Sequence, residues 1–295
     1  MLPEVFTPAI LRQLEMLKLS SRRAFLGQRQ GAHLSLKRGQ GVEFYDYRKY
    51  ELGDNPRHID WGLYGRSERI YVKRFREEQS LSVLVLLDSS PSMGVVPVQG
   101  ISKWELARDL ALALSYVALL KQDAVYVGTT SGGAIPRYLG AAAIHRMASS
   151  FETLQLSQPP DLIREVLRIA ARIRFPGVAF MISDLLIPFS DLERSVNVLL
   201  AKNIDLTILR VSSPLENNPL GNAEVALVID SETGEQQELF LPRAAQIEYQ
   251  RRLSEHVQLI RQFLARRGVR LLELSTEQDL QQIIAENFLR TGVLQ

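Results

Sequence analysis

The chain has 295 residues, enough for one large domain or two modest ones. Its apolar content of 46% and charged content of 23% are those of a globular protein with a buried core, and a net charge of +2 does not favour nucleic acid as a partner. Because cysteine is absent, a disulfide framework and a thiolate metal site are excluded. No stretch reaches the roughly 18 unbroken apolar residues of a membrane helix, and the N-terminus lacks a signal-peptide layout. We therefore expect a cytoplasmic protein without membrane insertion.

The first eighty residues divide into three pieces. Apolar residues recur at helical spacing between positions 10 and 17 and predict one helix. Residues 20–40 are basic and lack a period, which is typical of a connection. Residues 41–80 are rich in Tyr, Phe and Gly and predict strands joined by turns. We assign residues 1–79 to an N-terminal segment and residues 80–295 to an α/β domain.

From residue 80 onward, predicted strands and helices alternate, which indicates a mostly parallel sheet with helices on both faces. We expect strands over 81–87, 124–128, 135–139, 178–183, 206–211 and 269–274, and helices over 103–121, 141–151, 161–172, 190–202 and 243–267, with a last helix closing the chain. Ser190 and Glu193 have the spacing of a capping box at the start of one helix, and Gly268 ends another. Residues 224–240 predict a β-hairpin around the turn S-E-T-G.

The first strand of this domain ends on the polar sequence D-S-S-P-S. Its run V-L-V-L-L fits a parallel strand buried on both faces, and the carboxyl end of such a strand is where open α/β sheets bind ligands. Asp88, Ser90 and Ser92 offer one carboxylate and two hydroxyls at alternate positions. These hard oxygen donors suit Mg²⁺ or Mn²⁺, while the four scattered histidines argue against a zinc site. Alternatively, Asp88 and Ser90 simply cap the next helix.

The spacing D-x-S-x-S resembles the metal-ion-dependent adhesion site of von Willebrand factor A (vWA) domains. Three upstream blocks accompany it: G-x-G-V-E-F at 39–44, R-K-Y-E-L-G-D-N-P-R-H-I-D-W at 48–61 and Y-V-K-R-F-R-E-E at 71–78. In this order they resemble the bacterial domain-of-unknown-function family fifty-eight, whose core is vWA-like. The resemblance runs from about residue 20 to the C-terminus, and it implies a vWA-like, Rossmann-like fold for the α/β domain.

The vWA pattern takes its ion ligands from three loops. The first loop is complete here, with Asp88, Ser90 and Ser92. The third loop carries an acid after the fourth core strand, and V-A-F-M-I-S-D supplies it as Asp184. The second loop normally offers a Thr, but the sequence Q-P-P-D-L places Pro160 there, followed by Asp161, which could approach the ion directly or through water. The resemblance therefore implies a degenerate adhesion site for Mg²⁺ or Mn²⁺.

The block R-H-I-D-W is the family signature and contains Arg57, His58, Asp60 and Trp61. We interpret it as structural, with Trp61 anchoring the segment to the core while Arg57 and Asp60 form a pair in a buried turn. The alternative is that Arg57, His58 and Asp60 form a catalytic acid–base set.

Two enzyme motifs are missing from the sequence, the phosphate-binding loop G-x-x-x-x-G-K-[ST] and the nucleophile elbow G-x-S-x-G. We therefore expect no catalysis. The resemblance implies a protein-interaction module in which a partner's Asp or Glu carboxylate completes the coordination of the ion, and which works as an adaptor or co-chaperone of a MoxR-type AAA ATPase. The alternatives are a Mg²⁺- or Mn²⁺-dependent hydrolase that uses Asp88 and Asp184, and a metal-free scaffold, which Pro160 would suit.

Overall fold

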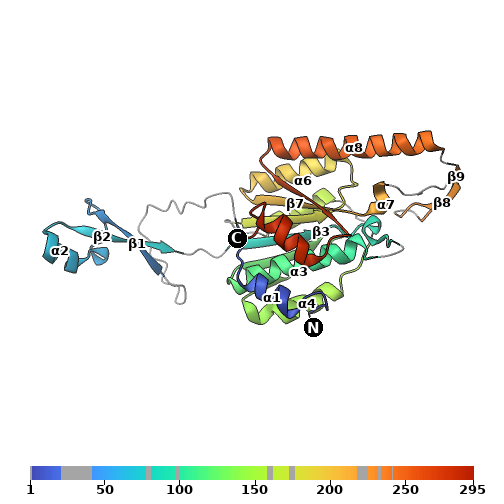
Figure 1. The fold of residues 1–295 in the computed structure, drawn as a ribbon. Helices are drawn as coiled ribbons and strands as arrows, with labels where there is room; N and C mark the ends of the chain where they lie inside the picture. Colours follow the sequence, from blue (N-terminus) through green and yellow to red (C-terminus); the bar gives the residue numbers. More distant parts are fainter. Residues whose placement is uncertain are drawn as a thin grey trace. The chain divides into compact units, whose positions relative to one another are not determined.

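The computed structural model describes residues 2–20, 42–77, 81–97, 100–157, 162–172, 177–217, 225–231, 234–240 and 242–295. The described residues of Met1–Arg23 and Leu81–Gln295 form one compact unit, and those of Ala24–Ser80 form a second (Figure 1). Helix α1 (Pro8–Glu15) belongs to the larger unit, although the sequence groups it with the β-rich segment. The reason is that α1 buries its apolar face in the same core as the helices of the α/β domain.

A six-stranded sheet forms the centre of the larger unit, within the residues described. Its strands are β3 (Ser82–Leu87), β4 (Ala124–Thr129), β5 (Arg137–Leu139), β6 (Gly177–Ser183), β7 (Asp205–Ser212) and β10 (Arg270–Ser275). They lie in the order β10-β7-β6-β3-β4-β5, and all neighbours are parallel except β4 and β5. The chain first builds outward from β3 on one side and then returns to build outward from β6 on the other. The strand order therefore reverses between β3 and β6, where an open α/β sheet binds ligands.

Helices cover both faces of this sheet, as the sequence predicts (Figure 1). Odd-numbered residues of β3, such as Val85, face a core shared with α1, α3 (Lys103–Leu120), α4 (Ile144–Glu152) and the C-terminal helices α9 (Leu280–Gln282) and η4 (Ile283–Leu289). Even-numbered residues, such as Leu84, face a second core under α5 (Leu162–Ala170), α6 (Phe189–Ala201) and α8 (Arg243–Arg266). No helix in the described part of the chain is both long and apolar enough to span a membrane.

The start of α3 is held by a capping box. The Ser102 hydroxyl accepts a hydrogen bond from the backbone N–H of Glu105 at 3.1 Å, and the Glu105 carboxylate accepts one from the backbone N–H of Ser102 at 2.8 Å. The capping box predicted at Ser190 and Glu193 is wrong, because α6 already begins at Phe189 and has Pro188 as its N-cap. The box at Ser102 fixes the backbone at Lys103, the first residue of α3, whose side chain enters the candidate site described below.

The smaller unit is a two-stranded antiparallel sheet of β1 (Val42–Lys49) and β2 (Tyr71–Glu77). The connection between them contains η1 (Pro56–His58) and α2 (Trp61–Ser67). The sequence predicts only strands and turns here and misses α2, since W-G-L-Y-G-R-S carries two glycines and has low helix propensity.

Within the described residues of the larger unit, a short helix and a β-hairpin lie between β7 and α8. The short helix α7 (Pro214–Asn217) is not predicted by the sequence. The predicted hairpin is present as β8 (Val225–Ile229) and β9 (Gln236–Phe240), which pair in an antiparallel register. Both elements lie on the path from the carboxyl end of β7, and α7 supplies a side chain to the candidate site described below.

A buried carboxyl in the turn between α3 and β4 makes stability depend on pH. Asp123 is 7% exposed and accepts a hydrogen bond from the backbone N–H of Leu81 at 2.7 Å. Burial raises the pKa of this carboxyl to about 6, although the hydrogen bond opposes the rise. The native protein therefore keeps this proton at a pH where the unfolded chain has lost it, and it should lose stability as pH rises from about 4 to about 6.

Replacement of the carboxyl by an amide tests this. Asp123→Asn keeps the hydrogen-bond acceptor and removes the buried charge, so we expect the free energy of unfolding at pH 7 to rise by about 1–3 kcal/mol and its pH dependence to flatten. Urea unfolding followed by circular dichroism between pH 4 and 8 measures both effects. Asp279→Asn, at the exposed N-cap of α9, is the matched control. An Asp123→Asn protein no more stable than wild type at pH 7 would contradict the prediction.

Candidate functional site

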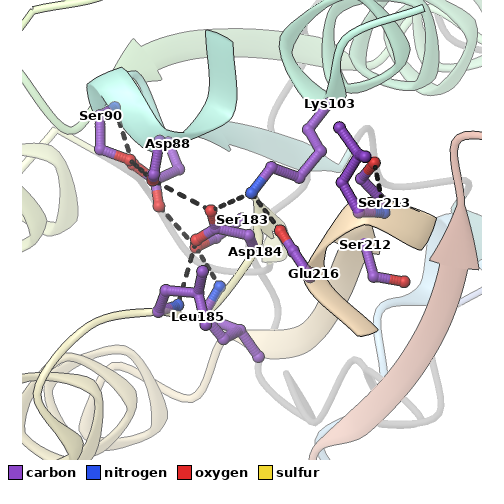
Figure 2. A network of polar contacts seen from close by, with 12 residues as sticks. Asp88, Ser90, Lys103, Ser183, Asp184, Leu185, Ser212, Ser213 and Glu216 are labelled. Atoms are coloured by element: carbon purple, nitrogen blue, oxygen red, sulfur yellow. Dashed lines mark hydrogen bonds and ion pairs between the residues drawn. The ribbon is translucent and has the colours of Figure 1, made fainter. Parts of the chain in front are cut away.

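Asp88 and Asp184 lie side by side at the carboxyl edge of the sheet. Asp88 follows β3 and Asp184 follows β6, and these strands are paired in parallel with Leu87 opposite Ile182. The backbone N–H of Asp88 donates to the carbonyl of Ile182 at 2.9 Å, which extends the pairing to the end of the strand. Both side chains are buried, with 3% of Asp88 and 1% of Asp184 exposed. The reversal of strand order thus brings together two acids that are far apart in the sequence (Figure 2).

Hydrogen-bond donors surround the Asp88 carboxylate. One oxygen, Oδ1, accepts from the backbone N–H of Ser90 at 3.0 Å and from the Thr130 hydroxyl at 3.2 Å. The other, Oδ2, accepts from the Ser183 hydroxyl at 2.6 Å. Burial raises the pKa of Asp88, the charge of Asp184 raises it further, and the hydrogen bonds from Ser183 and Ser90 oppose the rise. Thr130 follows β4, so the loop after β4 also holds Asp88 in place. The sequence does not predict this contact.

The two serines of D-x-S-x-S connect Asp88 to Asp184. The hydroxyls of Ser90 and Ser92 lie 3.0 Å apart, and the Ser92 hydroxyl donates to Oδ2 of Asp184 at 3.0 Å. The other Asp184 oxygen accepts from the backbone N–H of Leu186 at 3.0 Å. Ser90 is the N-cap of the short helix η2 (Pro91–Gly94), yet its hydroxyl makes no capping bond. The four predicted metal ligands are therefore brought together in one network, and the simple capping alternative does not describe what Ser90 does.

A lysine and a glutamate that the sequence analysis overlooks complete this network. The Lys103 ammonium donates to Oδ2 of Asp184 at 2.6 Å and also binds the Glu216 carboxylate (Figure 2). Only 3% of Lys103 is exposed. Burial opposes its charged form, but the negative charges of Asp184 and Glu216 outweigh burial and raise the pKa of Lys103. The lysine is therefore a cation bound between two carboxylates inside the protein.

Two sequence features could have pointed to these residues. A lysine at the start of a helix is placed unfavourably against the helix dipole, so its position there indicates a specific anionic partner. Glu216 follows β7, which is the next strand beyond β6 at the same edge of the sheet. An acid after each of three neighbouring strands is the pattern that would have revealed the cluster.

Arg210 on β7 forms the outer part of the cluster. Its guanidinium lies 4.0 Å from Oε2 of Glu216 and 3.7 Å from Oε1 of Glu273. Glu273 is already bound by Arg261 at 2.7 Å. Oε2 of Glu216 and Nε of Arg210 are buried without a hydrogen-bond partner. Glu216 therefore has one carboxylate oxygen engaged by Lys103 and a second that is only loosely compensated.

The described part of the second loop of the vWA pattern contacts the first loop. The backbone N–H of Ser157 donates to the carbonyl of Ser89 at 2.9 Å. A Cβ added to Gly94 would lie 2.3 Å from Cδ1 of Leu156. The lack of a side chain at Gly94 therefore permits the close contact with Leu156. Pro160 and Asp161 lie outside the described residues, and the predictions about them stay predictions.

In the smaller unit, Asp60 of the R-H-I-D-W block has a structural position. It is the N-cap of α2, accepts from the backbone N–H of Leu63 at 3.0 Å and from the Tyr47 hydroxyl at 2.8 Å, and pairs with Lys73 at 3.0 Å. The hydrogen bonds from Lys73 and Tyr47 lower the pKa of Asp60. Its ion-pair partner is thus Lys73 and not Arg57, so the predicted Arg57–Asp60 pair is wrong.

Trp61 does not enter a core within the described part of the smaller unit. It is 63% exposed and packs edge-to-face against Tyr64, with ring centroids 6.1 Å apart. The two strands and the seven-residue helix described in this unit bury too little apolar surface to enclose an indole, and the predicted anchoring of Trp61 to the core stays a prediction. Arg57 and His58 lie in η1, whose N-cap Asn55 accepts from the backbone N–H of Arg57 at 3.0 Å.

The donor set at the carboxyl edge fits a hard divalent cation in kind. Asp88, Ser90, Ser92 and Asp184 offer carboxylate and hydroxyl oxygens, which Mg²⁺ and Mn²⁺ prefer. The described residues contain no group of three or more His, Cys, Asp or Glu arranged to hold a metal, so water would supply the remaining positions. One obstacle is visible, since the Asp184 oxygen that faces the serines also binds Lys103.

The reversed strand order, the helices on both faces and the polar carboxyl edge define a vWA-like α/β protein. The chain belongs to the DUF58 family, domain-of-unknown-function family fifty-eight, whose profile, described as "Protein of unknown function DUF58", matches residues 46–258. It is 25% identical over 284 residues to the uncharacterized protein Rv1480 of Mycobacterium tuberculosis and to the uncharacterized protein Mb1516 of Mycobacterium bovis. Each alignment covers 94% of this chain and 88% of the relative.

Two solved structures are also similar to the chain. One is the conserved hypothetical protein BatB from Bacteroides thetaiotaomicron, with 18% identity and a TM-score of 0.41 over 72% of this chain and 99% of that one. The other is an aerotolerance-related membrane protein from Bacteroides fragilis, with 18% identity and a TM-score of 0.37 over 58% of this chain and 87% of that one.

Removal of the buried ammonium should destabilise the protein. Lys103→Met leaves Asp184 and Glu216 buried without their cation, and we expect it to lower the free energy of unfolding by about 3 kcal/mol. Lys103→Met/Glu216→Gln, which removes one of the two carboxylates as well, should recover part of that loss. Urea unfolding without added divalent ions compares the two variants with wild type. A Lys103→Met protein as stable as wild type would show that the ammonium is not needed to compensate the carboxylates.

Proposed function

We propose that this protein is a noncatalytic interaction module of the vWA type, an adaptor or co-chaperone that works with a MoxR-type AAA ATPase in the cytoplasm. Its docking site is the carboxyl edge of the sheet around Asp88 and Asp184. The observation that carries the proposal is the convergence of Asp88, Ser90, Ser92 and Asp184 in one hydrogen-bonded set at the point where the strand order reverses.

The charge of this site favours an ion-dependent partner. Lys103 pairs with Asp184 and Glu216, and Asp88 lies beside Asp184, so carboxylates outnumber the ammonium in this network. Without a further cation, the site would repel an acidic side chain of a partner. Mg²⁺ or Mn²⁺, when bound, supplies positive charge and an open coordination position for one carboxylate oxygen. We therefore propose that the partner offers an Asp or Glu, and that neither nucleic acid nor a membrane is its target.

Exposed apolar side chains flank the site and support an interface with a protein. Val95 and Val96 follow η2, the helix that contains Ser92, and are 45% and 63% exposed. Leu186 lies two residues after Asp184 and is 44% exposed. Apolar side chains around a polar centre are typical of a protein-binding surface. The loops that carry the ion ligands would thus also carry the apolar contacts.

One contact argues against the hydrolase alternative. A metal-dependent hydrolase would need a general base besides its ion ligands, and Glu216, the further acid of this network, is already paired with Lys103. The metal-free scaffold keeps one observation in its favour, because the buried Lys103 already supplies a positive charge at Asp184.

Binding to a purified MoxR-type ATPase tests the proposal. We expect wild type to bind it in Mg²⁺ and to release it in EDTA, and Asp88→Ala to weaken binding by about tenfold or more through loss of a charged ligand. Arg57→Ala, a change in the family signature, is the control and should bind as wild type does. Biolayer interferometry measures the affinities.

Two results would count against the adaptor. Equal binding by wild type and Asp88→Ala, with and without Mg²⁺, would show that the carboxyl edge is not the contact. Mg²⁺-dependent phosphatase or ATPase turnover that disappears in Asp88→Ala would support the hydrolase alternative.

A further inference from the structure

We propose that Lys103 is the resident cation of the carboxyl-edge site, that it competes with a divalent ion for Asp184, and that Glu216 holds it when the ion binds. This inference rests on the site of the proposed function and specifies how that site is loaded. It starts from the position of the ammonium, whose Nζ lies 2.6 Å from Oδ2 of Asp184 and also contacts Glu216.

The ammonium and a divalent ion need the same oxygen. Oδ1 of Asp184 is engaged by the backbone N–H of Leu186, while Oδ2 faces the Ser92 hydroxyl and Lys103. Asp88, Ser90, Ser92 and Asp184 would hold the ion, and Oδ2 is the Asp184 oxygen on the side of Ser92. A divalent ion and an ammonium so close together repel strongly in a buried site. Binding of the ion therefore requires Lys103 to leave Asp184.

Glu216 gives the displaced ammonium a place to stay. It already binds Lys103 through one oxygen, and its second oxygen, Oε2, is buried without a hydrogen-bond partner, with Arg210 no nearer than 4.0 Å. The backbone of Lys103 is fixed by the capping box at the start of α3, so rotation of the side chain is the movement required. In this way the lysine stays paired in both states of the site, and no carboxylate is left buried without compensation.

The competition also accounts for how two acids can be buried at adjacent strand ends in the protein without an ion. With Lys103 bound to Asp184, the ammonium compensates the charge of that carboxylate, and the site offers no open coordination position to a partner's carboxylate. With a divalent ion seated, the same edge becomes an acceptor for that carboxylate. Lys103 thus sets the concentration of ion at which the docking site forms.

The test compares divalent-ion binding in proteins of equal site charge. Lys103→Met/Glu216→Gln removes one positive and one negative charge, so the net formal charge of the site does not change. Mn²⁺ binding is followed by electron paramagnetic resonance, and Mg²⁺ binding by calorimetry. We expect the double variant to bind both ions about tenfold more tightly than wild type, or better, because the competing ammonium is gone.

Two further variants locate the effect. Glu216→Gln alone should bind Mn²⁺ several-fold more weakly than wild type, since Lys103 then has only Asp184 as its partner. Asp184→Asn added to the double variant should abolish the gain. Near-ultraviolet circular dichroism confirms that each variant is folded, and the double variant keeps the test valid if Lys103→Met alone is too unstable.

The outcomes separate this inference from the proposed function. A folded double variant that binds Mn²⁺ no more tightly than wild type, or that binds none at millimolar concentration, would overturn the competition. Tighter Mn²⁺ binding in the double variant supports it, even where binding of the ATPase proves independent of Mg²⁺. In that case the docking role fails and the competition between Lys103 and the ion stands.

Discussion

Two carboxylates that the sheet topology forces into one buried place are the constraint on which the rest of the site depends. Reversal of the strand order between β3 and β6 places Asp88 and Asp184 at adjacent strand ends, and hardly any of either side chain is exposed. Like charges in such a place repel and lose their hydration, so the fold must supply compensation nearby. Every other feature of the carboxyl edge can be understood as part of that compensation.

The compensation comes from several separate segments and ties them together. Hydroxyls after β4 and at the end of β6 bind Asp88, and the serines after β3 connect it to Asp184. Helix α3 contributes the ammonium of Lys103, which Glu216 of α7 also binds. The capping box at Ser102 contributes to the site because it fixes the backbone from which the Lys103 side chain extends. It also means that changes at the site will affect stability and ligand binding together.

The sequence predicts the sheet well because its strands are continuous apolar runs, and a run buried on both faces has few alternative structures. Asp88 and Asp184 are predictable for the same reason, since each directly follows such a run. Lys103 and Glu216 are harder to predict, because neither directly follows an apolar run, and their pairing joins residues 113 positions apart without a periodic signal. The sequence does not predict α2, because its two glycines give it a low helix propensity. It misplaces the start of α6, because Ser190 and Glu193 have the spacing of a capping box that does not form.

The position of α1 has a consequence for the smaller unit. Residues 18–20 pair with residues 293–295, and Leu19 forms a bridge with Leu294, so the chain is fastened to the larger unit before it enters the smaller one and again at β3 after it leaves. The smaller unit is therefore an insertion with two tethers, not a terminal appendage with one. Folding of the larger unit must therefore close the chain around the insertion, at a cost in loop-closure entropy that grows only slowly with the length of the insertion.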